Sequence, residues 1–430
     1  DKIADFFRQL DNLITLHQCE SCKKVAAVQS AFARRNLSKW ADSWEQRKLG
    51  DYFIERNERS GDGEMISVTI NSGIRKFDEL NRHDTKPDDL SKYKRVEIGD
   101  IAYNSMRMWQ GASGYSPYSG ILSPAYTVIT PKECVSSRFF SYFIKRPKTI
   151  HLFEINSQGL TKDTWNLKFP AFAPIEVKAP VSYEEQVNIS RILIQLDNLI
   201  TLHQRKYDKL VAVKKALLEK MFPADGETVP QIRFKGFSDA WEQRKLGDLC
   251  SITTGKLDAN AMVTCGKYDF YTSGIDVFKI DVAAFEGPAI TIAGNGASVG
   301  YMHLADGKFN AYQRTYVLTN FLADRSFLNV AIGNELPDKI QEEVRGSGIP
   351  YIVLNMLTDL VIPFPSREEQ AIIGACFSQL DNLITLHQCK VFYKNIIFKN
   401  IKFGGLETEN NTSWEQRKVS ELFRVTRGYV

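Results

Sequence analysis

The sequence predicts an α+β protein, in which two variable domains of mixed strands and helices are separated by long antiparallel coiled-coil helices with pseudo-two-fold symmetry. Two repeated strings and a helical seam predict this fold. The string LDNLITLHQ stands at residues 10–18, 196–204 and 380–388. The string WEQRK follows each copy, at residues 44–48, 241–245 and 414–418. The chain between these strings repeats poorly, so constant segments alternate with variable ones.

The spacing of the strings predicts the domain boundaries. A period of about 185 residues is much longer than a solenoid repeat and indicates duplicated domains joined by a shared connector. A third string, EEQ, precedes LDNLITLHQ at 184–186 and 368–370. We expect six segments: a partial helical module at 1–40, a first variable domain at 41–181, a central coiled-coil helix at 182–236, a second variable domain at 237–365, a distal coiled-coil helix at 366–413, and the start of a third unit at 414–430.

Composition indicates a cytoplasmic globular protein. The 430 residues are 43% hydrophobic and 25% charged, no signal peptide opens the chain, and no apolar run approaches the ~18 residues of a membrane helix. The seven cysteines are scattered, and the pair Cys19 and Cys22 lacks the second pair of a zinc site, so we expect reduced thiols and no metal. A net charge of +4 is compatible with nucleic-acid binding but does not require it.

The central copy of the repeat predicts one long helix. Its seam positions alternate in steps of four and three residues: Ile189, Leu193, Leu196, Ile200, His203, Tyr207, Leu210, Lys214, Leu217 and Met221. This 3.5-residue repeat is typical of a coiled coil, and a buried helix of an ordinary bundle is the alternative. Pro223 and Gly226 would end the helix, which would form a rod of about 50 Å.

Comparison of the three copies predicts which helices pair. The third copy keeps an apolar seam along its whole length, whereas the first copy loses it in its second half. We therefore predict that helix 187–222 pairs antiparallel with 369–402, and not chiefly with 1–35. In that arrangement a pseudo-two-fold axis would cross the middle of the rod.

Three histidines occupy the same seam position in the three copies. They are His17, His203 and His387, half of the six histidines in the chain. A polar seam residue that fixes the register of the helices is our first interpretation. A ligand or a catalytic base is the alternative.

The two variable domains share a skeleton despite their divergence. Segments 96–130 and 285–319 each contain a glycine, a strand, a polar turn with the letters GAS, a Gly-Tyr pair, a loop and a second strand. Short strand-like runs broken by Gly, Asn and Pro dominate both domains, and short helices are expected near 136–146 and 336–345. We expect mixed or antiparallel sheets in both.

The divergent loops hold the side chains that we expect to bind DNA. Arg and Lys pair with guanine, Asn and Gln pair with adenine, and all of them can hold phosphates. Each residue alone has an ordinary surface or packing role as its alternative. In the first domain the set is Tyr103, Asn104, Arg107, Trp109, Gln110, Tyr115 and Tyr118. In the second domain it is Asn295, His303, Lys308, Asn310, Tyr312, Gln313 and Arg314.

Motifs for catalysis are missing from the sequence. It contains neither the GxxxxGK[ST] loop of an ATPase nor the HExxH of a metalloprotease. The string GNGASVG at 294–300 follows a strand, but Val299 replaces the third glycine of a dinucleotide-binding loop. A Ser-His-Asp or Cys-His arrangement does not stand out either. We therefore expect a non-catalytic chain without a cofactor of its own.

The constant strings resemble those of the specificity subunit of type I restriction-modification enzymes. EEQ, the LDNLITLHQ helix, VAVKKALLEKMFP at 211–223 and WEQRKLGD at the start of each variable domain carry the resemblance, which covers essentially the whole chain. The resemblance implies that each variable domain is a target recognition domain that reads one half of a bipartite double-stranded DNA site. The helices would set the gap between the half-sites.

The resemblance also implies partners. Modification (methyltransferase) subunits, two by expectation, would dock on the helices and methylate adenine with S-adenosylmethionine. Restriction (motor-nuclease) subunits would use ATP and Mg²⁺. No membrane partner is expected.

The chain departs from the family layout because it begins inside a helix module and ends in a third WEQRK unit. It could therefore be a truncated or rearranged inactive fragment. Two rival functions are a coiled-coil scaffold that binds only proteins and a stand-alone methyltransferase or nuclease.

Overall fold

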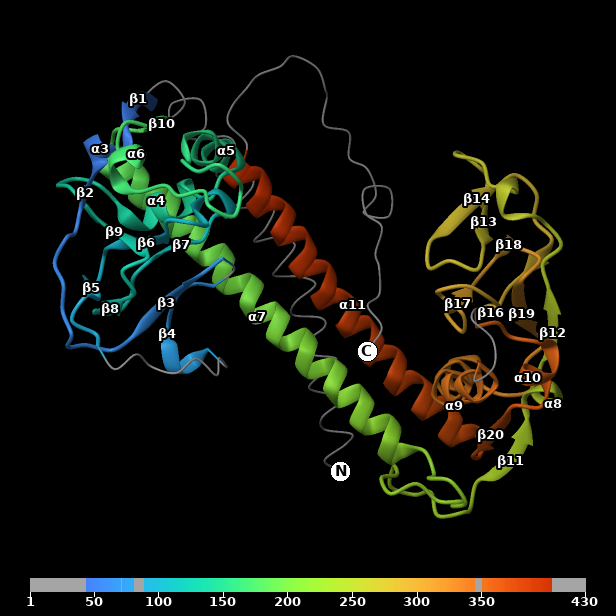
Figure 1. The fold of residues 1–430 in the computed structure, drawn as a ribbon. Helices are drawn as coiled ribbons and strands as arrows, with labels where there is room; N and C mark the ends of the chain where they lie inside the picture. The colour runs from blue at the N-terminus through green and yellow to red at the C-terminus, as the bar shows by residue number, and fades with distance from the viewer. Residues whose placement is uncertain (1–43, 71, 81–88, 345–349, 404–430) are drawn as a thin grey trace. The chain divides into compact units, whose positions relative to one another are not determined.

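The computed structural model describes residues 44–70, 72–80, 89–344 and 350–403 (Figure 1). The first copy of the repeat and the third WEQRK unit lie outside these residues, so the predictions for 1–40, His17 and 414–430 stay predictions. The described chain divides into two compact units. We call residues 44–202 with 390–403 the first unit, and residues 203–389 the second unit.

In the first unit, an antiparallel sheet of four strands carries the shared skeleton. Its order is β2 (Phe53–Glu55), β9 (Tyr126–Pro131), β6 (Ile101–Asn104) and β7 (Ser113–Tyr115). The central strand β6 is apolar because it is covered on both faces: Ile101, Ala102 and Tyr103 are fully buried.

The second unit repeats this sheet with a different sequence. Its order is β12 (Ser251–Thr254), β19 (Thr315–Thr319), β16 (Ala289–Ala293) and β17 (Met302–Ala305), and all its pairs are antiparallel. Central strand β16 is buried along its whole length. The skeleton predicted from the two divergent segments is therefore confirmed, with antiparallel main sheets in both units.

The constant string WEQRK forms a short strand in each unit. It is β1 (Trp44–Lys48), paired antiparallel with β10 (Glu176–Pro180), and β11 (Glu242–Lys245), paired with β20 (Val361–Phe364). The string therefore joins the beginning of each variable domain to its end.

The letters LGD that follow WEQRK form single helical turns, α3 (Leu49–Tyr52) and α8 (Leu246–Leu249). Their first leucines are fully buried. A Cβ atom on Gly50 would lie 3.0 Å from Ala173 Cβ, and one on Gly247 would lie 3.1 Å from the carbonyl oxygen of Thr358. Because the chain passes so close at both places, glycine suits both domains here.

Smaller sheets and helices distinguish the two units. The first unit has the hairpin β3 (Ile66–Thr69) with β4 (Gly73–Lys76), the pair β5 (Lys94–Val96) with β8 (Gly120–Leu122), and helices α4 (Ser137–Phe143), α5 (Pro147–Asn156) and α6 (Phe169–Phe172). The second unit has a sheet of β14 (Val277–Ile280), β13 (Tyr268–Tyr271), β18 (Lys308–Ala311) and β15 (Phe285–Glu286), and helices α9 (Arg325–Val344) and α10 (Leu354–Thr358).

Helix α4 lies where a short helix was predicted. Helix α9 begins well before the predicted start near residue 336, so the prediction for that region was too short.

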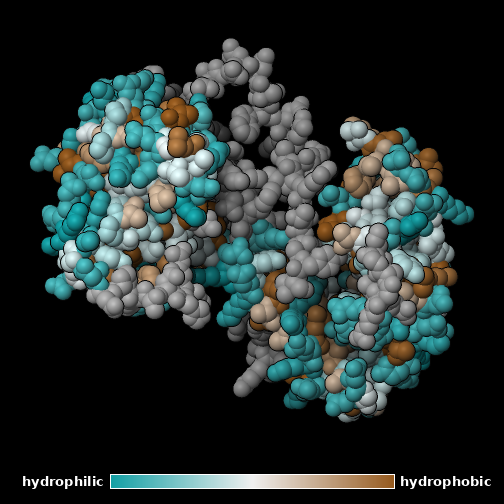
Figure 2. Space-filling view, viewed as in Figure 1, coloured by the Kyte–Doolittle hydropathy of each residue, from teal (hydrophilic) through white to brown (hydrophobic). Residues whose placement is uncertain are grey.

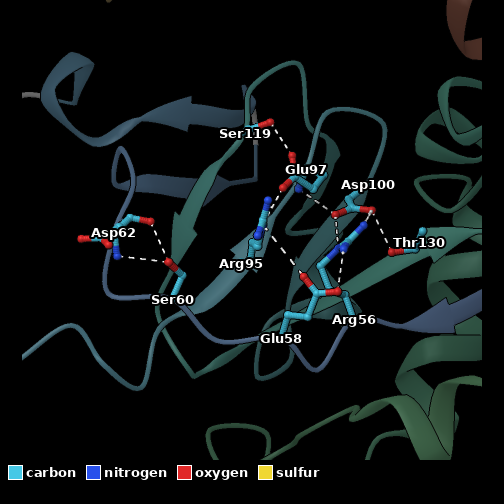
Figure 3. Close-up of polar contacts among 9 residues, drawn as sticks. All are labelled: Arg56, Glu58, Ser60, Asp62, Arg95, Glu97, Asp100, Ser119 and Thr130. Atoms are coloured by element: carbon cyan, nitrogen blue, oxygen red, sulfur yellow. Dashed lines mark hydrogen bonds and ion pairs between the residues drawn. The ribbon is translucent and has the colours of Figure 1, made fainter.

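An ion pair between half-buried Arg56 and buried Asp100 lies at the ends of the main-sheet strands in the first unit (Figure 3). The carboxylate of Asp100 accepts hydrogen bonds from Arg56 Nε at 2.7 Å and from Thr130 Oγ1 at 2.8 Å. Glu97 N also donates to Asp100. The pKa of Arg56 is raised, chiefly by its hydrogen bond to Asp100. These contacts link strands β2, β6 and β9 through side chains as well as through the backbone.

Two long helices carry the constant repeats, as predicted: α7 (Tyr183–Met221) and α11 (Arg367–Phe403). Every predicted seam position on α7 is buried or half-buried. In the second unit the helices are antiparallel, because His203 contacts His387 while Lys214, further along α7, contacts Asp381, earlier on α11. Figure 1 shows these parts of the two helices side by side.

The EEQ string anchors the first unit to helix α7. Gln186 Oε1 accepts a 2.8 Å hydrogen bond from the backbone N–H of Ser136, the residue before α4, and Gln186 Nε2 donates to the carbonyl oxygen of Pro180 at 2.9 Å. Beside it, Trp44 Nε1 donates to Glu185 at 2.8 Å. The two adjacent side chains Glu185 and Gln186 thus join the constant helix to the first strand of the domain, to the start of α4 and to the end of β10.

The second EEQ string makes the equivalent contacts in the second unit. Gln370 Oε1 accepts from the backbone N–H of Asp324, the residue before α9, at 3.0 Å, and Gln370 Nε2 donates to the carbonyl oxygen of Pro365 at 2.8 Å. Here Glu369 is paired with Arg233, whose two guanidinium nitrogens each lie 2.8 Å from a carboxylate oxygen. Gln186 and Gln370 therefore hold both domains in the same way.

An aromatic cluster fixes the junction where α7 ends. Phe222 lies 5.7 Å from Trp241, 6.1 Å from Phe327 and 6.4 Å from Phe377, measured between ring centroids. These four rings come from the end of α7, the constant segment 241–245, helix α9 and helix α11, and all are buried. Buried side chains of this size dominate core energetics, so this cluster stabilises the junction.

No helix in the part of the chain that the structure describes is both long enough and apolar enough to cross a membrane.

Candidate nucleic-acid interface

Two equivalent turns carry four of the side chains predicted to bind DNA, namely Arg107, Trp109, Gln110 and Asn295. The turns connect the central strand to the edge strand of each main sheet, at residues 105–112 and 294–301, and have equal lengths. Each turn is joined to a later segment by one backbone hydrogen bond of 2.8 Å, from Leu167 N to Ser105 O and from Ile352 N to Gly294 O. The same two pieces of chain therefore meet beside the main sheet in both units.

In the first unit, the turn displays polar side chains on a fixed backbone. Asn104 Oδ1 accepts from the backbone N–H of Met106, and Gly111 adopts φ +79°, which closes a single 3₁₀ turn. Arg107 and Gln110 are exposed, and Asn104 is half-buried. Arg107 and Gln110 can thus present planar hydrogen-bonding groups to a ligand.

Trp109 belongs to a second cluster that reaches across to the later segment. Its ring lies 5.6 Å from that of Trp165, edge to face, and its Nε1 donates to the carbonyl oxygen of Met106. Lys162 Nζ lies 5.5 Å from the centroid of Trp109 and 5.4 Å from that of Trp165. The cluster brings a cation and two indoles together on the rim of the turn.

Two tyrosines of the predicted set lie beneath cations. The Arg138 guanidinium lies 4.1 Å from the centroid of Tyr115, and Lys76 Nζ lies 5.3 Å from that of Tyr118. Both tyrosines are half-buried. In these pairs the charged groups of Arg138 and Lys76 lie near the protein surface, beside the two tyrosines.

Tyr103 is a different case. It is fully buried, its ring lies 5.3 Å from that of Phe172, and burial raises its pKa strongly. It packs in the core, and we therefore remove it from the DNA-binding set.

In the second unit, the exposed members of the set are Lys308, Gln313 and Arg314. Asn295 and Tyr312 are half-buried, and Asn295 forms an antiparallel bridge with Tyr351, whose side chain is exposed. Arg314 is positioned because its carbonyl oxygen accepts from Gly294 N at 2.9 Å. A polar turn and an exposed arginine therefore lie next to each other.

Two residues of the second set have internal contacts instead. Asn310 is buried and donates to the carbonyl oxygen of Val282 at 2.8 Å. It therefore ties strand β18 to the segment between β14 and β15, and we remove it from the set. The His303 ring lies 4.8 Å from Tyr301 and 5.2 Å from Tyr271. Burial raises the pKa of Tyr271 to about 12, which is consistent with a packed ring.

Sequence reasoning missed Lys76, Arg138, Lys162 and Trp165, which lie beside predicted residues. Lys162 and Trp165 follow Trp109 by more than fifty residues, so only the fold brings them together. The rings of Trp109 and Trp165 were the available signal, since half-buried tryptophans pack against partners.

The chemistry of the candidate interface is binding. Among the residues that the structure describes, no group of three or more His, Cys, Asp or Glu could hold a metal ion. On the face shown in Figure 2, hydrophilic residues cover most of each unit, and hydrophobic residues lie scattered among them. Cations, amides and aromatic rings, which can hold phosphates and bases, are what the two turns offer.

The sequence matches a known family model. The model is described as the type I restriction modification DNA specificity domain, and it matches residues 42–212 and 238–391, which include both variable domains and most of the helix after each. The chain belongs to this specificity family.

Two curated members of the family show how the similarity is distributed. The specificity subunit of type I restriction enzyme EcoDI from Escherichia coli is 41% identical over 144 residues, which cover 34% of this chain and only 31% of that protein. The specificity subunit of type I restriction enzyme MjaVIII from Methanocaldococcus jannaschii is 22% identical over 390 residues, covering 80% of this chain and 88% of that protein.

A crystal structure supports the fold of the family. The S subunit of the type I restriction-modification system from M. genitalium superposes with a TM-score of 0.57 at 17% identity, covering 84% of this chain and 96% of that one. The specificity family therefore shares this arrangement of sheets and long helices despite low sequence identity.

Proposed function

We propose that this chain is the specificity subunit of a type I restriction-modification complex. Each unit reads one half of a bipartite double-stranded DNA target, and the long helices set the gap between the halves. One observation carries the proposal: two domains of different sequence repeat one sheet, one polar turn and one glutamine anchor. A constant frame with divergent exposed turns is what two readers of different sequences need.

The reading surface in this proposal is the pair of turns with their neighbours. In the first unit it comprises Arg107, Gln110, Trp109 and Lys162, and in the second unit Asn295, Gln313 and Arg314. Arginine and amide side chains can make paired hydrogen bonds to base edges, whereas lysine holds phosphates. The turns are stiffened by backbone hydrogen bonds, which reduces the entropy lost on binding.

Partner subunits supply the chemistry in this proposal. Modification subunits dock on the helices and methylate adenine, and restriction subunits translocate and cleave DNA. S-adenosylmethionine, ATP and Mg²⁺ belong to those subunits, and this chain directs them to a site.

Domain exchange tests the proposal directly. Residues 249–347 are replaced by the corresponding segment of another family member, and the adenine methylation of a strain that carries the chimera and its modification subunit is mapped. We expect one half of the recognised sequence to change while the other half and the gap stay the same. An unchanged target, or methylation without sequence preference, would contradict the proposal.

The alternative function is a scaffold that binds only proteins. A DNA-binding measurement distinguishes it from a specificity subunit. A specificity subunit assembled with its modification partner binds duplex DNA, and its affinity falls steeply as salt rises because counterions are released. A scaffold shows no affinity that depends on salt and sequence in this way.

A further inference from the structure

The loop that follows helix α5 exposes a leucine completely. The side chain of Leu160 has a relative exposure of 102%, the highest among the large hydrophobic residues that the structure describes. Exposed leucines are common on protein surfaces, but most lie partly against a neighbouring side chain. Leu160 stands alone at the tip of its loop, where water surrounds it.

The loop that carries Leu160 is stiff. Gln158 and Asn166 close its base with two backbone hydrogen bonds of 3.0 and 2.8 Å. Across the tip, Thr164 Oγ1 accepts from Thr161 N at 3.2 Å, and Thr164 N donates to Thr161 O at 3.0 Å. These hydrogen bonds therefore fix the loop backbone in a conformation that exposes Leu160 to solvent.

Gly159 makes this frame possible. It adopts φ +151°, and a Cβ atom there would lie 2.7 Å from the carbonyl group of Thr164. A larger residue would push the two sides of the loop apart. The backbone thus takes a conformation that favours glycine at the position next to the exposed leucine.

The surroundings of Leu160 favour nucleic acid as its partner. Lys162 is exposed and lies over the Trp109 and Trp165 rings, although it also lies 3.4 Å from Glu154. Exposed Arg107 lies in the turn that joins this segment through Ser105 and Leu167. A protein-docking site usually offers a broad apolar patch, whereas one apolar tip beside cations matches the side chains that wedge between base pairs.

We propose that Leu160 inserts between adjacent base pairs of the half-site read by the first unit. Lys162 and Arg107 would hold the flanking phosphates while the leucine separates the bases. Partial unstacking costs a few kcal/mol and is recovered through closer contact with the bent duplex. This inference rests on the proposed function, because it concerns the same DNA surface.

The test uses the full chain assembled with its modification subunits and a duplex that contains the mapped target. The fluorescent adenine analogue 2-aminopurine is placed at successive positions of the half-site, excluding the methylated adenine. Its emission rises when its stacking is lost. The variants are Leu160→Ala, Leu160→Met as the conservative replacement, and Ile155→Ala as a matched exposed apolar control on helix α5.

We expect the wild-type complex to raise the emission several-fold at one step. Leu160→Ala should abolish that rise and weaken binding by about tenfold, whereas Leu160→Met and Ile155→Ala should keep both. A Leu160→Ala complex that keeps the rise overturns the wedge while leaving DNA recognition intact. Loss of subunit assembly in Leu160→Ala, seen by size-exclusion chromatography, would place the leucine against a protein and also overturn it. A wild-type complex without sequence-dependent binding would instead refute the proposed function.

Discussion

The Nδ1 atoms of His203 and His387 lie 2.8 Å apart in the buried seam between helices α7 and α11. The two residues hold the same position in two copies of LDNLITLHQ, so equivalent residues meet where the antiparallel helices cross. Such a contact lies on a local two-fold axis of the helix pair. The hydrogen bond requires one Nδ1 to donate and the other to accept, which is possible only if at least one ring is neutral.

We predict that the histidine pair fixes register more than it adds stability. His203→Leu alone should lower the free energy of unfolding by about 1–3 kcal/mol, because it leaves the buried His387 Nδ1 without this contact. The double variant His203→Leu/His387→Leu should recover most of that loss, since an apolar pair suits the seam. Urea unfolding of both variants measures the difference. A double variant as unstable as the sum of the single variants would show that the contact is chiefly stabilising.

Gln186 and Gln370 should contribute more to the stability of the folded protein than their exposed neighbours in the EEQ string. Gln370→Ala removes one acceptor and one donor at a buried position, and we expect a loss of about 1–3 kcal/mol. Glu368→Ala, two residues earlier and exposed, is the control and should change stability by less than about 0.5 kcal/mol. Hydrogen exchange at the start of α9 should also rise in Gln370→Ala only. Equal losses of stability in Gln370→Ala and Glu368→Ala would show that the Gln370 hydrogen bonds do not anchor the domain.

Cysteine reactivity should follow burial. Burial raises the pKa of both Cys250 and Cys376 to about 12, so at pH 8 their thiolate forms are scarce in the folded protein. Cys134 and Cys265 are exposed. We predict that brief iodoacetamide treatment labels Cys134 and Cys265 but spares Cys250 and Cys376, and that urea makes all four reactive. Peptide mass spectrometry measures each site, and labelling of Cys376 in the folded chain at the rate of Cys134 would contradict the packing of α11.

Exposed Arg107, in the first turn, and exposed Arg314, next to the second turn, should contribute to DNA affinity. We predict that Arg107→Ala or Arg314→Ala weakens binding of the cognate duplex by about 1–3 kcal/mol if the guanidinium contacts a base. Arg47→Ala is the control, because Arg47 is an exposed arginine of the constant strand β1 that pairs with Glu45. Titration at several salt concentrations separates base from phosphate contacts. If both variants keep the DNA affinity and the salt dependence of the wild-type protein, these arginines do not contact DNA.

The constant parts of the fold could be predicted because repetition exposes them. The seam from Ile189 to Met221 and the matching seam of the third copy have a helical period that no sheet would produce, and both helices lie where predicted. The cleaner seam of the third copy predicted which helix pairs with α7, but seam quality alone did not predict that the pair is antiparallel. The role of Gln186 could not be predicted, because its partners at Ser136 and Pro180 depend on how the domain closes on itself.

The variable parts were harder to predict for physical reasons. The segment that contains Pro337 and Gly333 disfavours a helix locally, yet burial of Phe327, Leu328 and Leu336 on the core extends α9 through it. Tyr103 and Asn310 were expected in DNA-binding loops, but they lie in strands β6 and β18 and are buried. Their burial depends on the strands that cover them, and local sequence does not reveal which face is covered.

In the function that we propose, the two domains read the DNA and the helices set the gap, and these two properties are separate. Helix α7 is continuous from the first unit into the second, and 39 residues at ~1.5 Å each make it about 58 Å long. The most direct test inserts one heptad between Lys214 and Leu217 and a matching heptad between Cys376 and Leu380 on α11, so that both seams stay in register. Each helix becomes about 10 Å longer.

Methylation mapping of a strain that carries this variant and its modification subunit gives the answer. We predict that both half-site sequences stay the same while the gap between them lengthens, by up to about three base pairs at ~3.4 Å each. Methylation at the original gap, or a change in the bases of either half-site, would contradict this prediction, because the helices would then not be what separates the two readers.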